Sequence, residues 1–180
     1  MMKIKLKDKR TVEIVPFNSS IPASAFLKFI NDIIGEDVYI MHNQEFDLAA
    51  EEEWKKRQLS ALRARNFMGL VAMDGKKVVA NLEARRPFQG KLSENIEFGV
   101  AVSKDFRGVG LGEIMLRMII KEAKKQLTPR NMYIRVVADN KPAVNLYKKV
   151  GFTKIIGREP KFFKHRGKYL DHITLLYTGE

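Results

Sequence analysis

The sequence predicts an α/β or α+β fold, in which one sheet carries helices on both faces. Apolar runs of strand length lead the chain, and strand–helix–strand passages occur after residue 95. Length is the third indication, because 180 residues most simply form one domain with a full hydrophobic core. We therefore expect a single domain over residues 1–180.

Individual elements follow from periodicity and from start and stop signals. The expected strands share apolar, β-branched runs and cover 3–17, 67–73, 77–83, 96–102, 132–138, 152–156 and 169–177. The expected helices share apolar residues at helical spacing and cover 21–34, 47–65, 113–127 and 143–149. Asp47 is a suitable N-cap for the second helix. Asp74-Gly75 between two apolar runs predicts a tight hairpin.

A glycine-rich turn joins the strand at 96–102 to the helix at 113–127. Its sequence is Arg107-Gly108-Val109-Gly110-Leu111-Gly112. The N–H groups of such a turn and the positive end of the helix dipole together form an anion site. Arg107 adds a guanidinium that suits phosphate oxygens. The turn therefore predicts a pyrophosphate-binding site.

Other known classes of glycine-rich phosphate-binding turn match this sequence less well. A P-loop needs Gly, four residues and then Gly-Lys-Ser/Thr, which the sequence lacks. A dinucleotide fingerprint needs G-x-G-x-x-G and an acid near the next strand's end, whereas here the spacing is G-x-G-x-G and Arg135 marks that strand. A purely structural turn would not need three alternate glycines after an arginine.

The turn resembles the acetyl-CoA pyrophosphate loop of the GNAT superfamily of N-acetyltransferases. That pattern is Arg/Gln-x-x-Gly-x-Gly/Ala, and Arg107, Gly110 and Gly112 fill its positions. The segment from Asn140 to Phe152 resembles the family's Asn…Ala…Leu-Tyr…Gly-Phe segment. The closing Gly167-Lys-Tyr-Leu-Asp171 is similar to the last hairpin of the branch that acetylates ribosomal proteins and amino acids.

This resemblance implies a mixed, twisted sheet of about six or seven strands. Its fourth and fifth strands, here about 94–102 and 131–138, would splay apart, with CoA between them. The acetyl-CoA-binding residues that the resemblance implies lie at the strand end, in the turn and on the later helix: Val100, Ala101, Val102, Arg107, Gly108, Val109, Gly110, Leu111, Gly112, Asn140 and Tyr147.

Catalytic roles are also implied by the resemblance. Tyr147 matches the family's acid near the CoA sulfur, although a packing role is the alternative. Asn140 matches a cofactor contact and suits a helix cap as well. Glu97 is the candidate base and Glu94 is the alternative, while a solvent-facing role for Glu97 stays open. Arg135 occupies the other location where the family places a base.

The absence of cysteine excludes disulfides, thiolate metal sites and an acyl-cysteine intermediate. Direct attack by the amine within a ternary complex is therefore expected. The three histidines, His42, His165 and His172, lack metal-site spacing, so no metal is expected. A base role for His165 or His172 remains an alternative.

The net charge of +12 favours acidic partners. Basic and aromatic residues alternate over Lys161–Lys168, which motivates a second hypothesis: a nucleic-acid- or ribosome-binding module without catalysis. A flexible loop on the substrate side is the simpler interpretation, and for the enzyme we expect no nucleic acid.

For the enzyme, the acceptor is open among a protein N-terminus, an amino acid, a polyamine and an antibiotic amine. No apolar run is long enough for a membrane span, so we expect no membrane and a cytoplasmic location. A homodimer is a further expectation from the family.

Overall fold

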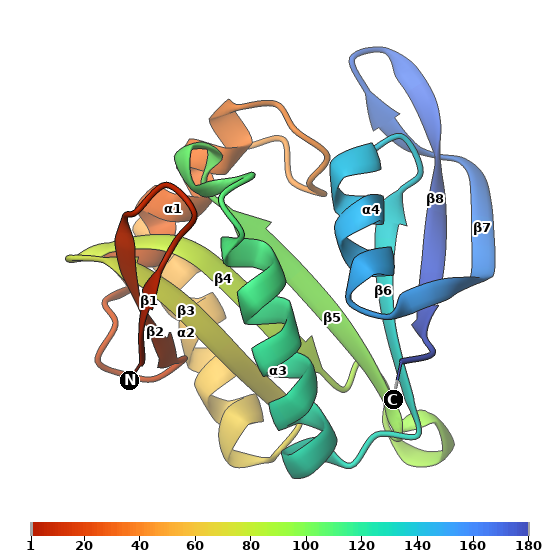
Figure 1. The fold of residues 1–180 in the computed structure, drawn as a ribbon, viewed down its shortest axis with the longest axis horizontal. Helices are drawn as coiled ribbons and strands as arrows, with labels where there is room; N and C mark the ends of the chain where they lie inside the picture. Colours follow the sequence, from red (N-terminus) through yellow and green to blue (C-terminus); the bar gives the residue numbers. More distant parts are fainter. Residues whose placement is uncertain (1, 180) are drawn as a thin grey trace.

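The computed structural model describes residues 2–179, which form a twisted sheet with helices on both faces (Figure 1). Strands within this range are Met2–Lys5 (β1), Thr11–Pro16 (β2), Phe67–Asp74 (β3), Lys77–Arg85 (β4), Asn95–Val102 (β5), Asn131–Val137 (β6), Phe152–His165 (β7) and Lys168–Tyr177 (β8). The α-helices are Ala23–Gly35 (α1), Leu48–Arg63 (α2), Leu111–Leu127 (α3) and Lys141–Lys149 (α4).

The strand order is β1-β2-β3-β4-β5-β6-β8-β7. Neighbours are antiparallel except β5 and β6, which pair in parallel. The chain enters β6 through α3, so the crossover helix lies over the sheet as a parallel connection requires (Figure 1). The mixed sheet and the helices on both faces confirm the expected fold class.

The described residues hold eight strands rather than the expected six or seven. The expected strand at 3–17 is in fact the antiparallel pair β1 and β2, joined by a turn at residues 6–10. The turn closes through Leu6 N–H to Arg10 O (2.8 Å) and Lys9 N–H to Leu6 O (3.0 Å). Lys9 takes the left-handed φ of 72° that glycine usually supplies. No glycine or proline therefore marked this turn in the sequence.

β7 is also longer than expected. The sequence predicted a strand over 152–156 and a flexible loop over Lys161–Lys168, and the loop prediction was wrong. β7 continues to His165 and turns back into β8 at Arg166-Gly167. Irregular pairing at three places along β7 hides the two-residue alternation that identifies a strand.

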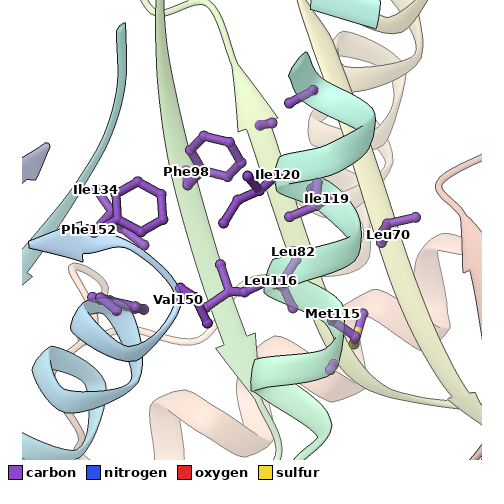
Figure 2. Packing of buried hydrophobic residues seen from close by; sticks show 14 of the residues in the cluster. Leu70, Leu82, Phe98, Met115, Leu116, Ile119, Ile120, Ile134, Val150 and Phe152 are labelled. Atoms are coloured by element: carbon purple, nitrogen blue, oxygen red, sulfur yellow. The ribbon is translucent and has the colours of Figure 1, made fainter. Parts of the chain in front are cut away.

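One face of the sheet is covered by α3 and α4. Figure 2 shows Leu116, Ile119 and Ile120 of α3 packed against the sheet near Leu82 and Phe98. Each of these five side chains is at most 5% exposed. Burying side chains of this size stabilises the fold by about 1.5–3 kcal/mol each. α3 is thereby fixed on the sheet, and its first turn is held at the end of β5.

The opposite face is covered by α1 and α2, but only in part. An aromatic cluster of Phe17, Phe26, Trp54 and Phe67 has ring centroids 5.4–5.6 Å apart. Among the described residues, the buried members of this second core come from no strand after β4. The face of β5, β6 and β8 beyond this core is therefore available to a ligand. Between residues 2 and 179, no helix is long and apolar enough to cross a membrane.

Candidate active site

The sheet separates between β5 and β6. Their pairing begins at Asn95 with Asn131 and ends at Phe98 with Ile134. Beyond this point β5 still pairs with β4 as far as Val102, and β6 still pairs with β8 as far as Val137. The two strands diverge toward the start of α3 (Figure 1). The predicted splaying is thus confirmed.

Residues Gly99–Val102 have a β-strand partner on one side only within the described structure. Strand N–H and C=O groups need partners, and an amide-bearing ligand can satisfy them as an added strand does. Val102 O already accepts from Arg107 Nε at 2.8 Å. The arrangement fits the pantetheine role predicted for Val100, Ala101 and Val102.

The glycine turn lies at the open end of this split. Gly108 and Gly110 have φ of 74° and 91°, which strain any other residue. Gly110 is the N-cap of α3, so the helix begins at Leu111, two residues earlier than expected. The N–H groups of the first turn have no intrahelical acceptor and carry the positive end of the dipole. This geometry fits a pyrophosphate.

Close packing explains the third glycine of the turn. A Cβ on Gly112 would lie 3.3 Å from Leu146 Cδ2 of α4 and 3.8 Å from Val102 Cγ2 of β5. Gly112 therefore lets the first turn of α3 approach both elements that border the split. Of the two apolar residues of the turn, Val109 is partly buried against the core and Leu111 is fully buried. Both side chains therefore pack the turn onto the core.

Two cations lie at the turn. Arg107 donates to Glu36, with Nη1–Oε2 at 2.5 Å and Nη2–Oε1 at 3.2 Å, so the guanidinium is tied to the end of α1. Lys7, which sequence reasoning missed, donates its N–H to Val109 O at 3.2 Å. Its side chain lies 3.5 Å from the position of a Cβ on Gly110. No local pattern distinguishes Lys7 from the other lysines of the N-terminal hairpin.

α4 borders the split on the side opposite α3 (Figure 1). Asn140 caps this helix, because its side-chain oxygen accepts from Ala143 N–H at 3.3 Å. Tyr147 is 6% exposed, and its ring packs edge-on near Phe152. Burial raises the pKa of the Tyr147 phenol well above its usual value, so the hydroxyl keeps its proton at neutral pH.

Glu97 lies on the face opposite α3 and is 5% exposed. Its two carboxylate oxygens accept from Arg135 Nε at 2.7 Å and from Arg85 Nη2 at 3.2 Å. Such charge-assisted bonds stabilise the anion. Glu94, the alternative base, is exposed just before β5, and its carbonyl accepts from Arg130 N–H at 3.0 Å.

Two further carboxyl groups on this face were missed. Glu83 is paired across the sheet with Gly69 of β3 and Gly99 of β5. Glu51, in the first turn of α2, is 6% exposed. Burial, and then the nearby Glu83, raise the pKa of Glu51 to about 7. Burial also raises the pKa of Glu83, against the opposing effects of Arg85 and Asn81. The sequence did contain an indication of Glu83, because it is an acidic residue inside the apolar run at 78–84.

His172 of β8 is the register partner of Val137 on the opened part of β6, and His165 ends β7. His165 Nδ1 is 3.6 Å from Asp37 Oδ1, and His172 Nδ1 is 3.3 Å from Glu159 Oε2. Arg166 also pairs with Asp37, at 2.8 Å. The contacts of His165 and Arg166 with Asp37 join the β7–β8 hairpin to the segment between α1 and α2, whereas the His172–Glu159 contact lies within the hairpin. No group of His, Asp and Glu within residues 2–179 has the geometry to hold a metal ion.

A shallow depression of about 350 Å³ adjoins Glu97 and Arg135 on the same face. Its lining is mostly apolar and includes Phe88, Tyr133, Ile156 and Leu176. Tyr133 is the register partner of Glu97, which places this depression one strand over from the carboxylate.

A sheet that opens beside an anion-binding helix start defines an acyl-CoA-dependent acyltransferase. The chain belongs to the Acetyltransferase (GNAT) family, whose model matches residues 32–152. It is therefore an acetyl-CoA-dependent N-acetyltransferase. Membership favours this function over the hypothesis of a non-catalytic nucleic-acid-binding module.

Comparison with individual proteins gives the same family. An L-methionine sulfoximine/L-methionine sulfone acetyltransferase of Pseudomonas paraeruginosa is 30% identical over 81% of this chain and 82% of its own. The L-amino acid N-acetyltransferase AaaT of Escherichia coli is 29% identical over 57% of this chain and 62% of its own. The structure of yncA from Salmonella typhimurium, solved with its cofactor acetyl-CoA, matches with a TM-score of 0.78. It covers 94% of this chain and 95% of its own at 19% identity, which shows the fold.

Proposed function

We propose that the enzyme acetylates the α-amino group of a free amino acid or a close analogue, by direct attack within a ternary complex. One observation carries this proposal. Arg85 and Arg135 both bind Glu97 on the face beside the split, and their side chains are 44% and 41% exposed. Arg85 uses only Nη2 and Arg135 only Nε to bind Glu97, so both guanidinium groups keep further N–H donors for a second carboxylate. Arginine binds carboxylates with a matching fork of N–H groups.

The remaining surface on this side suits an uncharged acceptor side chain. The 350 Å³ depression next to Arg135 is lined by Phe88, Tyr133 and Leu176 and is open to solvent. A polyamine would meet the arginine pair with like charge, which costs free energy. The names of the Pseudomonas and Escherichia coli relatives also point to amino acids and their analogues.

We propose the following roles for the residues of the site. Acetyl-CoA supplies an activated acetyl thioester. Arg107 to Gly112 hold its pyrophosphate, Val100 to Val102 hold its pantetheine, and Asn140 supports the cofactor side from the start of α4. A backbone N–H near Val100 stabilises the developing oxyanion. Tyr147 keeps its proton and donates it toward the leaving sulfur.

Glu97 is the residue of this site that the family resemblance proposes as the base. Glu97 was predicted from the sequence, and it lies on the acceptor face as a base must. However, protonating Glu97 would disrupt its contacts with both Arg85 and Arg135. Those contacts suit Glu97 better to orienting the arginine pair.

An acceptor panel tests the proposed function. Calorimetry first checks that acetyl-CoA binds. Turnover is then measured with L-methionine sulfoximine, L-methionine sulfone, other L-amino acids, their amides, spermidine and N-terminal peptides. We expect a free amino acid or analogue to give the highest kcat/KM, with its amide at least about tenfold lower, since a charged hydrogen bond is worth about 1.5–3 kcal/mol. Faster turnover of peptides or spermidine would contradict the proposal.

Arg135→Gln provides the matched variant. It should lower kcat/KM for the free acid about 10- to 100-fold and leave kcat/KM for the amide nearly unchanged, because only the acid carries the carboxylate. Arg57→Gln, on the exposed surface of α2, is the control and should change neither value. Equal losses for acid and amide would mean that Arg135 does not bind the carboxylate.

A further inference from the structure

We propose that Glu83, supported by Glu51 and Asn81, takes the proton that the acceptor amine releases. The inference rests on the proposed function and adds a catalytic residue to it. It is drawn from the position of Glu83 in the sheet, from the side chains around it and from an unsatisfied buried amide.

The position of Glu83 comes from strand register. Its partner on β5 is Gly99, the first residue after the last β5–β6 pair at Phe98. Gly99 is exposed although it lies inside a strand. A Cβ on Gly99 would have one neighbour within 4 Å, the Cβ of Glu83 at 3.8 Å. The missing side chain therefore leaves free space beside Gly99 on the face where Glu83 lies.

The reacting carbon belongs at the same place. The predicted donor site begins at the glycine turn and continues along β5 from Val102 to Val100. At about 3.3 Å per residue, the next position down the strand is Gly99, where the split closes. An acceptor amine that approaches the acetyl group from the α1–α2 face would therefore reach the free space at Gly99, beside Glu83.

The surroundings of Glu83 suit a base that works near neutral pH. From α2, the buried Glu51 faces it with like charge, and from its own strand Arg85 faces it with opposite charge. Its partners on β3 and β5 are glycines, which carry no charge. On α1, Lys28 and Asp32 pair with each other at the surface. Burial raises the pKa of both carboxyls, and the nearby Glu83 raises that of Glu51 further.

Asn81 supplies an independent indication of a ligand. It is 9% exposed, and its Nδ2 donates to Glu83 Oε1 at 3.0 Å. Its Oδ1 is buried and has no hydrogen-bond partner among the described residues. Buried acceptors are normally satisfied. A donor that arrives beside Glu83, such as the N–H of an ammonium group, would supply the missing bond.

The proton balance requires such a group. The acceptor enters as an ammonium ion and leaves as an amide, so it releases two protons as the C–N bond forms and the C–S bond breaks. One proton ends on the CoA thiol, with the Tyr147 hydroxyl as the proposed hydrogen-bond donor to the leaving sulfur. The other must go to a protein base and then to water. A base with a pKa near the working pH does this best.

The pH dependence of kcat/KM tests the assignment with the fastest amine of the panel. Glu83 must be deprotonated to act, so the parent rate should rise with pH over a range above the ordinary carboxyl pKa. Glu83→Gln should lower kcat/KM at pH 7 by about 100-fold or more. The deficit should shrink toward pH 10, where the amine loses its proton unaided. Glu83→Asp should recover part of the loss.

Two further variants separate Glu83 from its neighbours. Glu51→Gln removes the like charge, so the pKa of Glu83 should fall and the rise in rate should move to lower pH. Glu97→Gln is the matched control and should keep the rise in the same pH range as the parent. A rise that survives Glu83→Gln and disappears in Glu97→Gln would overturn the proposal and assign the base to Glu97.

Carboxyl ¹³C NMR of the free protein gives a readout that needs no acceptor. Two glutamate signals, assigned with the Gln variants, should titrate above the usual value near 4.3, and each variant should lower the other's pKa. Titration of both below pH 5 would overturn the proposal. Calorimetry with acetyl-CoA should give the parent affinity in every variant. A parent that binds no acetyl-CoA would instead overturn the proposed function, and the base assignment with it.

Discussion

The surroundings of Tyr147 fix its protonation state. Its phenol is 6% exposed, and burial raises its pKa. The conjugate acid of a CoA thiolate has a pKa near 8.5, below that of the phenol. Full proton transfer to the free thiolate is therefore uphill, so in the proposed mechanism Tyr147 would act most strongly while the C–S bond is still breaking. The hydroxyl stabilises the leaving sulfur chiefly as a hydrogen-bond donor.

Tyr147→Phe tests this role. It removes the hydroxyl and keeps the ring that packs near Phe152. We expect kcat to fall about 10- to 100-fold, at the low end for an acid catalyst because the thiolate is a tolerable leaving group. Acetyl-CoA affinity, measured by calorimetry, should stay within about twofold. Unchanged turnover would mean that Tyr147 contributes only to packing.

Glu51 links the site to stability. Its pKa is raised to about 7 in the folded protein from an ordinary 4.5. A raised acid pKa means that the folded state binds the proton more tightly than the unfolded state. The group therefore costs nothing below about pH 4.5, and the folded state loses stability as pH rises from there to about 7.

Glu51→Gln should remove that loss. At pH 8 the free energy of unfolding of the variant should exceed that of the parent by about 2 kcal/mol. This is less than the shift in pKa alone would give, because water can partly rehydrate the charged carboxyl. At pH 4 the difference should vanish. Urea unfolding at both pH values measures it. The exposed neighbour Glu52 gives the control, since Glu52→Gln should show no such pH-dependent gain.

At the scale of elements, the segment between α1 and α2 is fastened at two points. Glu36 holds Arg107 of the glycine turn, and Asp37 holds Arg166 of the β7–β8 hairpin. The segment thereby connects the donor side of the site to the acceptor side. Both Arg107 and Glu36 are accessible enough for solvent to weaken their pair.

Glu36→Gln should strengthen acetyl-CoA binding. The variant frees the Arg107 guanidinium and removes a negative charge near the pyrophosphate site. A pair of this kind is worth about 0.2–1 kcal/mol, so the dissociation constant should fall about 1.4- to fivefold at low salt. Calorimetry measures it, with Asp32→Asn in α1 as control. Weaker binding would show that Glu36 aligns Arg107 for the phosphate.

Local signals predicted the elements that depend on local chemistry. The Asp74-Gly75 hairpin formed as expected, with Gly75 at a φ of 59°. Asp47 caps α2, accepting from Ala50 N–H at 2.8 Å. The N-terminal hairpin escaped prediction because Lys9 supplies the left-handed turn. The proximity of Glu51 to Glu83 could not be predicted either, because 31 residues separate them in the sequence. Only the packing of α2 on the sheet brings them close together.

For the whole molecule, the proposed mechanism divides the two ligands between the two faces of one sheet. α3 and α4 border the proposed donor site from one face, and the charged and glycine positions Glu83, Glu97 and Gly99 lie toward the other. Partial cover by α1 and α2 leaves that second face open beyond β4. The net charge of +12 suits a donor that carries phosphates. The single-domain assignment over 1–180 and the homodimer remain predictions.

The four-residue parallel pairing of β5 with β6 has a consequence for the free protein. Past Phe98 and Ile134, each strand presents an inner edge inside the sheet. Strand edges recruit extended chains, and proteins usually cover or shorten them to avoid aggregation. In the proposed site, acetyl-CoA would cover this edge with its peptide-like arm. We therefore expect the free protein to associate through this edge more readily than its complex with acetyl-CoA.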